Sequence, residues 1–318
     1  MVYLEAFSKV LPVLLLIGLG ALLRRFGFLS EAAIHGFKQL VVNITLPAAL
    51  FLAFAGVTLE GGHIVIVALI FLLCLLALWA SRLRRPMAGI DSDYLPPLVT
   101  GFEAGMMGYA IYGAVFGTDN IFQFAVIDLG QVLFVFFILV PYVQRLSVGP
   151  APFTHTLRSF LRTPVILSIL LGILFNQLGL ARAAETWPLS ASVVAAILDT
   201  LRLLAAATTP LITLVIGYEV SLQRQNLGAP LRTVGLRLLY WVPVGIVLNF
   251  LVIGSLFPGN RLLQAAVMTM FILPPPFVIP IFMSNSNEND QAYVVNTLSL
   301  ATVVTLVAFT VVSVLYAV

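Results

Sequence analysis

Apolar runs of roughly 18 to 25 residues recur along the whole chain, separated by short polar or proline-containing segments. An α-helix rises 1.5 Å per residue, so a helix of about 20 residues crosses a hydrocarbon core of about 30 Å. Of the 318 residues, 61% are hydrophobic and only 9% are charged, which leaves no stretch for a soluble domain. The sequence therefore predicts an all-α integral membrane protein.

Breaks between the apolar runs divide the chain into ten predicted spans. They are residues 6–23, 34–55, 63–81, 95–116, 120–142, 164–180, 191–219, 234–256, 261–283 and 291–316. We number them 1 to 10 in chain order. The first run lacks a small-residue cleavage site, so we expect a retained span and not a signal peptide.

The Lys and Arg residues predict the orientation of these spans. With the N-terminus outside, twelve of them fall on the inner side: Arg24, Arg25, Lys38, Arg82, Arg84, Arg85, Arg145, Arg158, Arg162, Arg224, Arg232 and Arg237. Three fall on the outer side: Lys9, Arg182 and Arg261. Inner loops carry the excess of positive charge, so both termini are expected outside. This bias explains the net charge of +3 without a nucleic-acid partner, and the short loops suit a bacterial inner membrane.

The two halves of the chain resemble each other. PVLLLIGLGALLRRFGF, starting at Pro12, shares eight of its seventeen residues with PVILSILLGILFNQLGL, starting at Pro164. In the same alignment Pro47 pairs with Pro210, and Asp128 with Asn296. Because each unit holds five spans, an odd number, the second unit is inverted relative to the first. We therefore expect two inverted five-helix repeats, in residues 1–145 and 160–318.

Span 9 contains LPPPFVIP, with Pro274, Pro275 and Pro276 in succession. A proline inside a helix costs about 3 kcal/mol, because it lacks the N–H group and clashes with the preceding turn. We expect the helix to end near Leu273 and a new helix to begin with Pro274 in its first turn. The carbonyl groups freed by such a break at membrane depth need protein or a wet cavity beside them.

The repeat places a second break in span 4, opposite the prolines. There Gly105 and Gly108 loosen the helix and expose backbone N–H groups. Two half-helix N-termini directed at one point form a site for an anion. The alternative is that the glycines only permit close packing and the prolines only kink a helix. Tyr109 and Tyr112, in the same span, either hydrogen-bond a ligand or pack in the core.

Polar side chains at membrane depth give further candidate site residues. Glu103 lies beside the span 4 break and Asp128 lies within span 5, where a carboxylate is costly and usually functional. Each is a candidate to bind a proton or a sodium ion, and the alternative is a structural hydrogen bond. Gln131, Asn296 and Asn43 are amides that either contact a substrate or support the helices. Gln131 shares a helix face with Asp128, and Asn43 precedes Pro47 by one turn.

Other kinds of site have little support. The single cysteine, Cys74, excludes a disulfide framework and a site with several cysteine ligands. HExxH and GxSxG motifs are both absent, so we expect no enzyme, no metal centre apart from a sodium site at Glu103 or Asp128, and no cofactor beyond the coupling ion.

Four stretches in this order resemble the auxin efflux carrier family, which includes the plant PIN-type exporters. They are Leu11-Pro12 with Gly20, NITLPAALF from Asn43, GFEAGMMGYAIYGAVFG from Gly101 and TTPLITLVIGYEVSL from Thr208. The resemblance extends over essentially the whole chain. It implies a PIN, NhaA and bile-acid-symporter-like fold in which helices 4 and 9 cross at their breaks. Helices 1, 2, 6 and 7 would form a scaffold domain, and helices 3–5 and 8–10 a transport domain that moves as an elevator.

The same resemblance implies a homodimer formed through the scaffold and a substrate such as malate, malonate or auxin. This sequence departs from the family where many members have Asn and Pro in helix 4, since Glu103 and Ala110 stand there. An acid at the site repels an anion unless it is protonated or paired with a cation. The first hypothesis is a secondary transporter of a small organic anion, with H⁺ or Na⁺ as the coupling ion. The alternative is a membrane sensor or receptor module that binds a small molecule at the same crossing.

Overall fold

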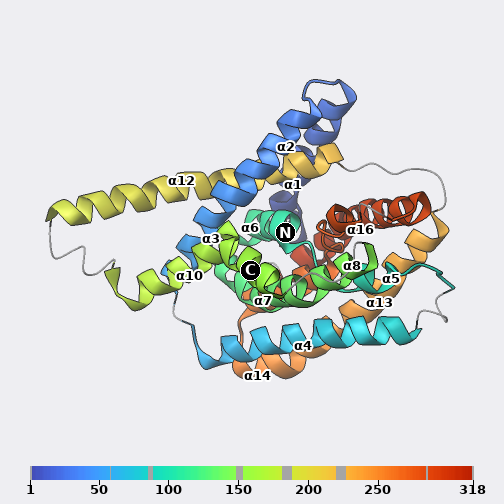
Figure 1. Ribbon diagram of the computed structural model, residues 1–318. Helices are drawn as coiled ribbons and strands as arrows, with labels where there is room; N and C mark the ends of the chain where they lie inside the picture. The colour runs from blue at the N-terminus through green and yellow to red at the C-terminus, as the bar shows by residue number, and fades with distance from the viewer. Residues whose placement is uncertain are drawn as a thin grey trace. The chain divides into compact units, whose positions relative to one another are not determined.

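The computed structural model describes residues 2–57, 59–84, 89–147, 153–180, 188–219, 227–283 and 286–316. Within these ranges the chain forms helices and no strand (Figure 1). The α-helices are α1 (Val2–Arg25), α2 (Glu31–Leu40), α3 (Leu46–Ala55), α4 (Gly61–Arg84), α5 (Leu95–Val99), α6 (Tyr109–Phe116), α7 (Ile121–Phe134), α8 (Val140–Ser147), α9 (Phe153–Arg162), α10 (Pro164–Gln177), α12 (Pro188–Glu219), α13 (Gly228–Leu248), α14 (Gly254–Leu256), α15 (Arg261–Ile272) and α16 (Glu288–Leu315). The π-helical turns are η1 (Val41–Thr45), η3 (Ala104–Gly108), η5 (Val135–Leu139) and η6 (Asn249–Ile253), and the 3₁₀ turns are η4 (Thr118–Asn120) and η7 (Pro280–Phe282).

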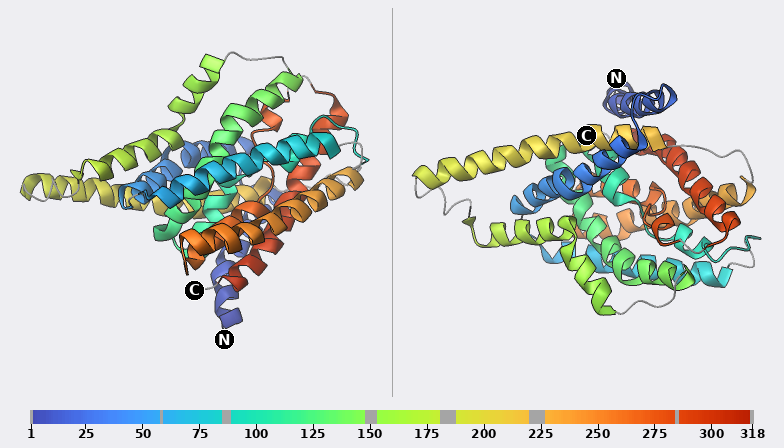
Figure 2. Two further views of the ribbon diagram at one scale, coloured as in Figure 1. Left: turned by 90° about the horizontal axis from the view of Figure 1, so that it is seen from below. Right: turned by 45° about the horizontal axis from the view of Figure 1, so that its top comes forward.

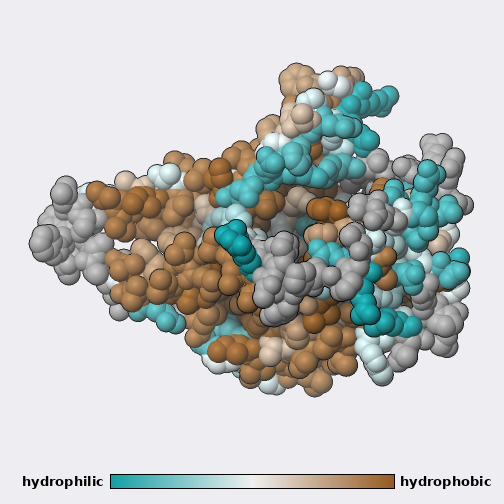
Figure 3. Space-filling view, in the orientation of Figure 1, coloured by the Kyte–Doolittle hydropathy of each residue, from teal (hydrophilic) through white to brown (hydrophobic). Residues whose placement is uncertain are grey.

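Six stretches of the described residues are helical, long and apolar enough to cross a membrane. They are Glu31–Ala55, Gly61–Arg82, Thr118–Ser147, Ser192–Glu219, Gly228–Leu256 and Glu288–Leu315. The apolar helices α10 and α15 are shorter. Large hydrophobic side chains are exposed on α4 and α10, where Figure 3 shows hydrophobic surface. For the described residues, the expectation of an all-α chain with helices able to span a membrane is thus confirmed.

The chain divides into two compact units. Unit 1 consists of Met1–Glu60, Gly105–Ala125 and Ser159–Glu219. Unit 2 consists of Gly61–Ala104, Val126–Arg158 and Val220–Val318. Unit 1 therefore holds predicted spans 1, 2, 6 and 7 together with the second half of span 4 and the start of span 5.

In unit 1, α1 packs along α12 and α3 packs along α10 (Figures 1 and 2). The first pair is held close by two glycines. A Cβ on Gly20 would clash with the carbonyl oxygen of Leu214, and one on Gly217 would clash with that of Ile17. No larger residue fits at either position, so small residues allow the two backbones to touch, as is common between membrane helices.

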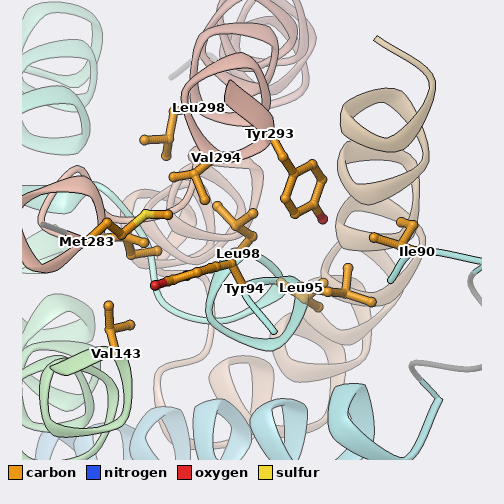
Figure 4. Close-up of a cluster of buried hydrophobic side chains, with 11 residues drawn as sticks. Ile90, Tyr94, Leu95, Leu98, Val143, Met283, Tyr293, Val294 and Leu298 are labelled. Carbon is orange, nitrogen blue, oxygen red and sulfur yellow. The ribbon is translucent and has the colours of Figure 1, made fainter. Parts of the chain in front are cut away.

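In unit 2, α13 packs against α15 and α16, and α4 packs against α5. A cluster of buried apolar side chains lies among α5, α8, the start of α16 and the segment that follows α15. Figure 4 shows Tyr94, Leu98, Met283, Val294 and their neighbours in this cluster facing one another. The cluster fixes the position of the two irregular segments described next, because Val99 borders one of them and Ile279 belongs to the other.

The helix of span 9 breaks where the prolines stand, but it does not restart there. α15 ends at Ile272, and Leu273–Ile279 is without regular helix until the 3₁₀ turn η7. The expected new helix with Pro274 in its first turn is therefore wrong. The reason is that Pro275 and Pro276 each push the residue before them out of the helical region, so no helix begins before the third proline.

Span 4 also breaks, although earlier than predicted. α5 ends at Val99, Thr100 is extended with ψ 158°, and Gly101 has φ +69°. The turn η3 then starts at Ala104 and leads into α6. Gly105 and Gly108 consequently lie inside a helical turn and not in the break, which occupies Thr100–Glu103. The residue that permits the break is Gly101, since a positive φ is easy only for glycine.

Candidate functional site: the paired helix breaks of unit 2

The two irregular segments of unit 2 bind each other. We call Thr100–Glu103 the first break and Leu273–Ile279 the second break. The Glu103 N–H donates to the Pro274 carbonyl at 2.9 Å. A Cβ on Gly101 would lie 2.9 Å from Cγ of Pro276, so the segments also touch at Gly101. Main-chain groups outside a helix need such partners when they lie in a membrane protein's interior.

The Arg237 guanidinium joins both breaks. The side chain comes from α13 and is only 2% exposed. Its five hydrogen bonds all end on main-chain carbonyls: Nε donates to Leu273 at 3.0 Å, Nη1 to Leu98 at 3.2 Å and Val99 at 2.9 Å, and Nη2 to Gly101 at 2.5 Å and Pro274 at 3.5 Å. The Thr305 hydroxyl donates to the carbonyl of Ile272, the last residue of α15. Side chains thus donate to the carbonyls of Ile272, Leu273 and Pro274, and the Glu103 N–H also donates to that of Pro274.

Aromatic rings enclose the guanidinium. Its Cζ lies 4.7 Å from the centre of the Phe102 ring. That ring lies 4.8 Å from the Trp241 ring and 5.4 Å from the Phe271 ring, between centroids. The indole Nε1 of Trp241 also donates to the Val99 carbonyl at 2.8 Å. The cation is therefore held in an apolar enclosure, where hydrogen bonds to carbonyls are stronger than in water.

Gln131 on α7 binds the first break as a neighbouring strand would. Its Oε1 accepts from the Phe102 N–H at 3.2 Å, and its Nε2 donates to the Phe102 carbonyl at 3.1 Å. Nε2 also donates to Oδ1 of Asp128 at 3.0 Å, and Asp128 is 2% exposed. One amide therefore satisfies both main-chain groups of Phe102 and connects the break to a buried carboxylate.

The Glu103 carboxylate binds the first amide that follows the three prolines of the second break. Pro274, Pro275 and Pro276 have no N–H, so Phe277 carries the first main-chain donor after them. Oε2 of Glu103 accepts from this N–H at 2.6 Å, and the side chain is largely buried. Glu103 thus holds the second break through both its main chain and its carboxylate.

The structure brings together six of the residues that the sequence singled out: Glu103, Asp128, Gln131, Pro274, Pro275 and Pro276. Asn296 is buried on α16 of the same unit, and none of the hydrogen bonds above includes it. Gly105, Gly108, Tyr109, Tyr112 and Asn43 lie in unit 1.

The unit 1 residues have local surroundings that fit packing. Tyr109 and Tyr112 are buried, and their rings lie 5.0 and 5.4 Å from that of Phe124. Asn43 lies in η1 and donates from Nδ2 to the Gln39 carbonyl at 2.9 Å. That bond supports the turn before Pro47.

The sequence predicts Arg237 as an inner-side cation at a span end and does not single it out as a site residue. The structure buries its side chain against the carbonyls of both breaks. The signal was its position inside the predicted span 234–256, where a charged residue has a partner within the protein. Trp241, four residues later on the same face of α13, was also missed.

A cavity of about 330 Å³ lies directly after the second break, lined by Pro280, Ile281, Met283, Gln291 and Val295. Its volume is near the lower end of the range for small-molecule sites.

A scan against protein-family models finds no match for the chain, and a comparison with curated proteins finds none either.

Proposed function

We propose that the protein is a secondary active transporter that moves a small organic anion across a membrane by alternating access around the paired breaks of unit 2. The observation that supports this most is the Glu103 carboxyl group on the Phe277 N–H, a buried acidic side chain on an amide where the two breaks meet. Broken helices that present main-chain groups to one point are the usual binding sites of such transporters.

The Phe277 N–H is the group that a carboxylate substrate would seek. While Glu103 is ionised, it holds this donor and repels a second anion. After Glu103 takes up a proton it loses its charge, so the substrate carboxylate becomes the better acceptor. In this scheme the substrate and one proton bind together, and H⁺ is the coupling ion.

The finer topology is part of the same proposal. It has ten spans in two inverted repeats, both termini outside a bacterial inner membrane, and a homodimer formed through the spans of unit 1. Unit 2, which contains the paired breaks, would be the part that moves as an elevator. The resemblance to auxin efflux carriers supports the repeats, the dimer and the elevator motion. The excess of Lys and Arg in the inner loops supports the orientation of the termini.

Uptake into proteoliposomes tests the proposal. The purified protein is reconstituted, and entry of labelled malate, malonate and auxin is followed with and without an imposed pH gradient. We expect uptake of at least one acid, driven by the gradient. In Glu103→Gln the side chain stays polar but no longer titrates, so uptake becomes independent of the pH gradient.

Glu288→Gln is the matched control, because Glu288 is an exposed acid at the start of α16 in the same unit. It is expected to keep the response of the unaltered protein. Identical pH dependence in Glu103→Gln and the unaltered protein would remove Glu103 from the coupling. Saturable binding of an acid without counterflow in sealed vesicles would favour a sensor or receptor module in place of a transporter.

A further inference from the structure

Five carbonyl oxygens from the two breaks and the residues before them converge on one position. Leu98, Val99 and Gly101 supply three of them, and Leu273 and Pro274 supply the other two. Two of these residues end or follow α5, and two follow the end of α15. Carbonyls at the C-terminal ends of interrupted membrane helices form a site for a cation, because they point outward with their negative ends and lack helical partners.

We infer that the Arg237 guanidinium is the built-in cation of this carbonyl cluster, and that the protein binds no sodium ion at the paired breaks. Arginine suits the position, because it stays charged and presents five N–H donors in a fixed plane. Each of its hydrogen bonds ends on one of the five carbonyls, so the oxygens that would coordinate a metal ion are already engaged.

A second cation would also be repelled at this position. The guanidinium carries a full positive charge within an apolar enclosure of Phe102, Trp241 and Phe271. Like charges at short distance repel strongly where water is excluded. The nearest acid of the first break, Glu103, already accepts from Phe277. For ion coupling, which rests on the proposed function, this arrangement excludes sodium from the five carbonyls and leaves a proton as the ion that couples at Glu103.

Thermal unfolding of the purified protein tests the inference without any transport measurement. The melting temperature is recorded in sodium chloride and in choline chloride at equal ionic strength. We expect the same value in both for the unaltered protein. A saturable rise with sodium would overturn the inference, while uptake in proteoliposomes would remain a separate question.

Variants at Arg237 locate the effect. Arg237→Ala opens the cation position, so we expect a lower melting temperature that millimolar guanidinium or sodium partly restores. Arg232→Ala is the matched control: Arg232 is an exposed arginine of α13 whose hydrogen bonds to Gly228 and Gly89 lie away from the breaks. It should respond to neither ion. Equal stability of the two variants, or an Arg237→Ala protein that responds to neither ion, would refute the assignment.

Arg237→Lys keeps the test informative if the alanine variant does not fold. Lysine retains the charge but has three donors at one point in place of five in a plane. We expect a protein less stable than the unaltered one that still shows no response to sodium. A sodium-stabilised lysine variant would contradict the idea that a side-chain cation fills the position.

Discussion

Gly101→Ala is the change that tests the pairing of the two breaks most directly. Gly101 has φ +69°, a conformation that costs a residue with a Cβ about 1–2 kcal/mol. The added methyl group would lie 2.9 Å from Cγ of Pro276 and 3.1 Å from Cδ2 of Leu139. The leucine can rotate, but the proline ring is part of the second break, and overpacking of this kind costs about 1–3 kcal/mol. The expected loss in the free energy of unfolding is therefore about 2–5 kcal/mol.

Gly259→Ala separates the two contributions. Gly259 belongs to the same unit and has φ +77°, but nothing lies within 4 Å of its added Cβ. It should lose only the conformational part, about 1–2 kcal/mol. Both variants are unfolded in detergent by heat or by a denaturing surfactant, and uptake is measured in proteoliposomes. If Gly101→Ala loses no more stability than Gly259→Ala, the contact between Gly101 and Pro276 is not as described here.

Two further changes probe the hydrogen bonds around the first break. Gln131→Leu leaves the N–H and carbonyl of Phe102 without their partner, and since each buried unsatisfied group costs about 1–3 kcal/mol, we expect a loss of about 2–6 kcal/mol in unfolding free energy. A loss within the error of the measurement would mean that water or another group replaces the amide. Trp241→Phe keeps a ring against Phe102 but removes the indole N–H that donates to the Val99 carbonyl. This carbonyl still accepts from Arg237, so we expect the free energy of unfolding to fall by about 1 kcal/mol, measured by thermal unfolding. Trp79→Phe, at an exposed tryptophan of α4, should change nothing.

At the paired breaks, side chains from other helices satisfy the freed main-chain groups. Arg237, Gln131 and Thr305 satisfy main-chain groups that a continuous helix would satisfy by itself. Because the three prolines have no N–H group, Phe277 carries the first main-chain donor after them. This N–H is therefore the one that Glu103 or a substrate would bind.

The local pattern of the sequence was enough to predict an all-helical membrane protein and two interrupted helices. Hydrophobicity over 20 residues and the missing N–H of proline are properties of short segments, so they hold whatever surrounds them. The same pattern correctly singled out Glu103, Asp128 and Gln131 as polar side chains that are buried. It placed the first break too late, because the glycines at 105 and 108 are the more conspicuous signal, and the sequence does not show that Gly101 takes a positive φ beside Pro276.

Only the tertiary structure decided which side chains bind the main-chain groups of the two breaks. Arg237 reaches carbonyls 136 to 139 residues away, and Glu103 accepts from an amide 174 residues away. In the sequence Arg237 lies inside the predicted span 234–256 and Arg232 lies just before it, which predicts a partner within the protein for Arg237 but does not identify that partner. The packing of α13 against α15 directs the guanidinium to the freed carbonyls. The local sequence predicts where a helix breaks and which main-chain groups lose their partners. Which side chain satisfies those groups depends on the helix that packs beside the break in the tertiary structure.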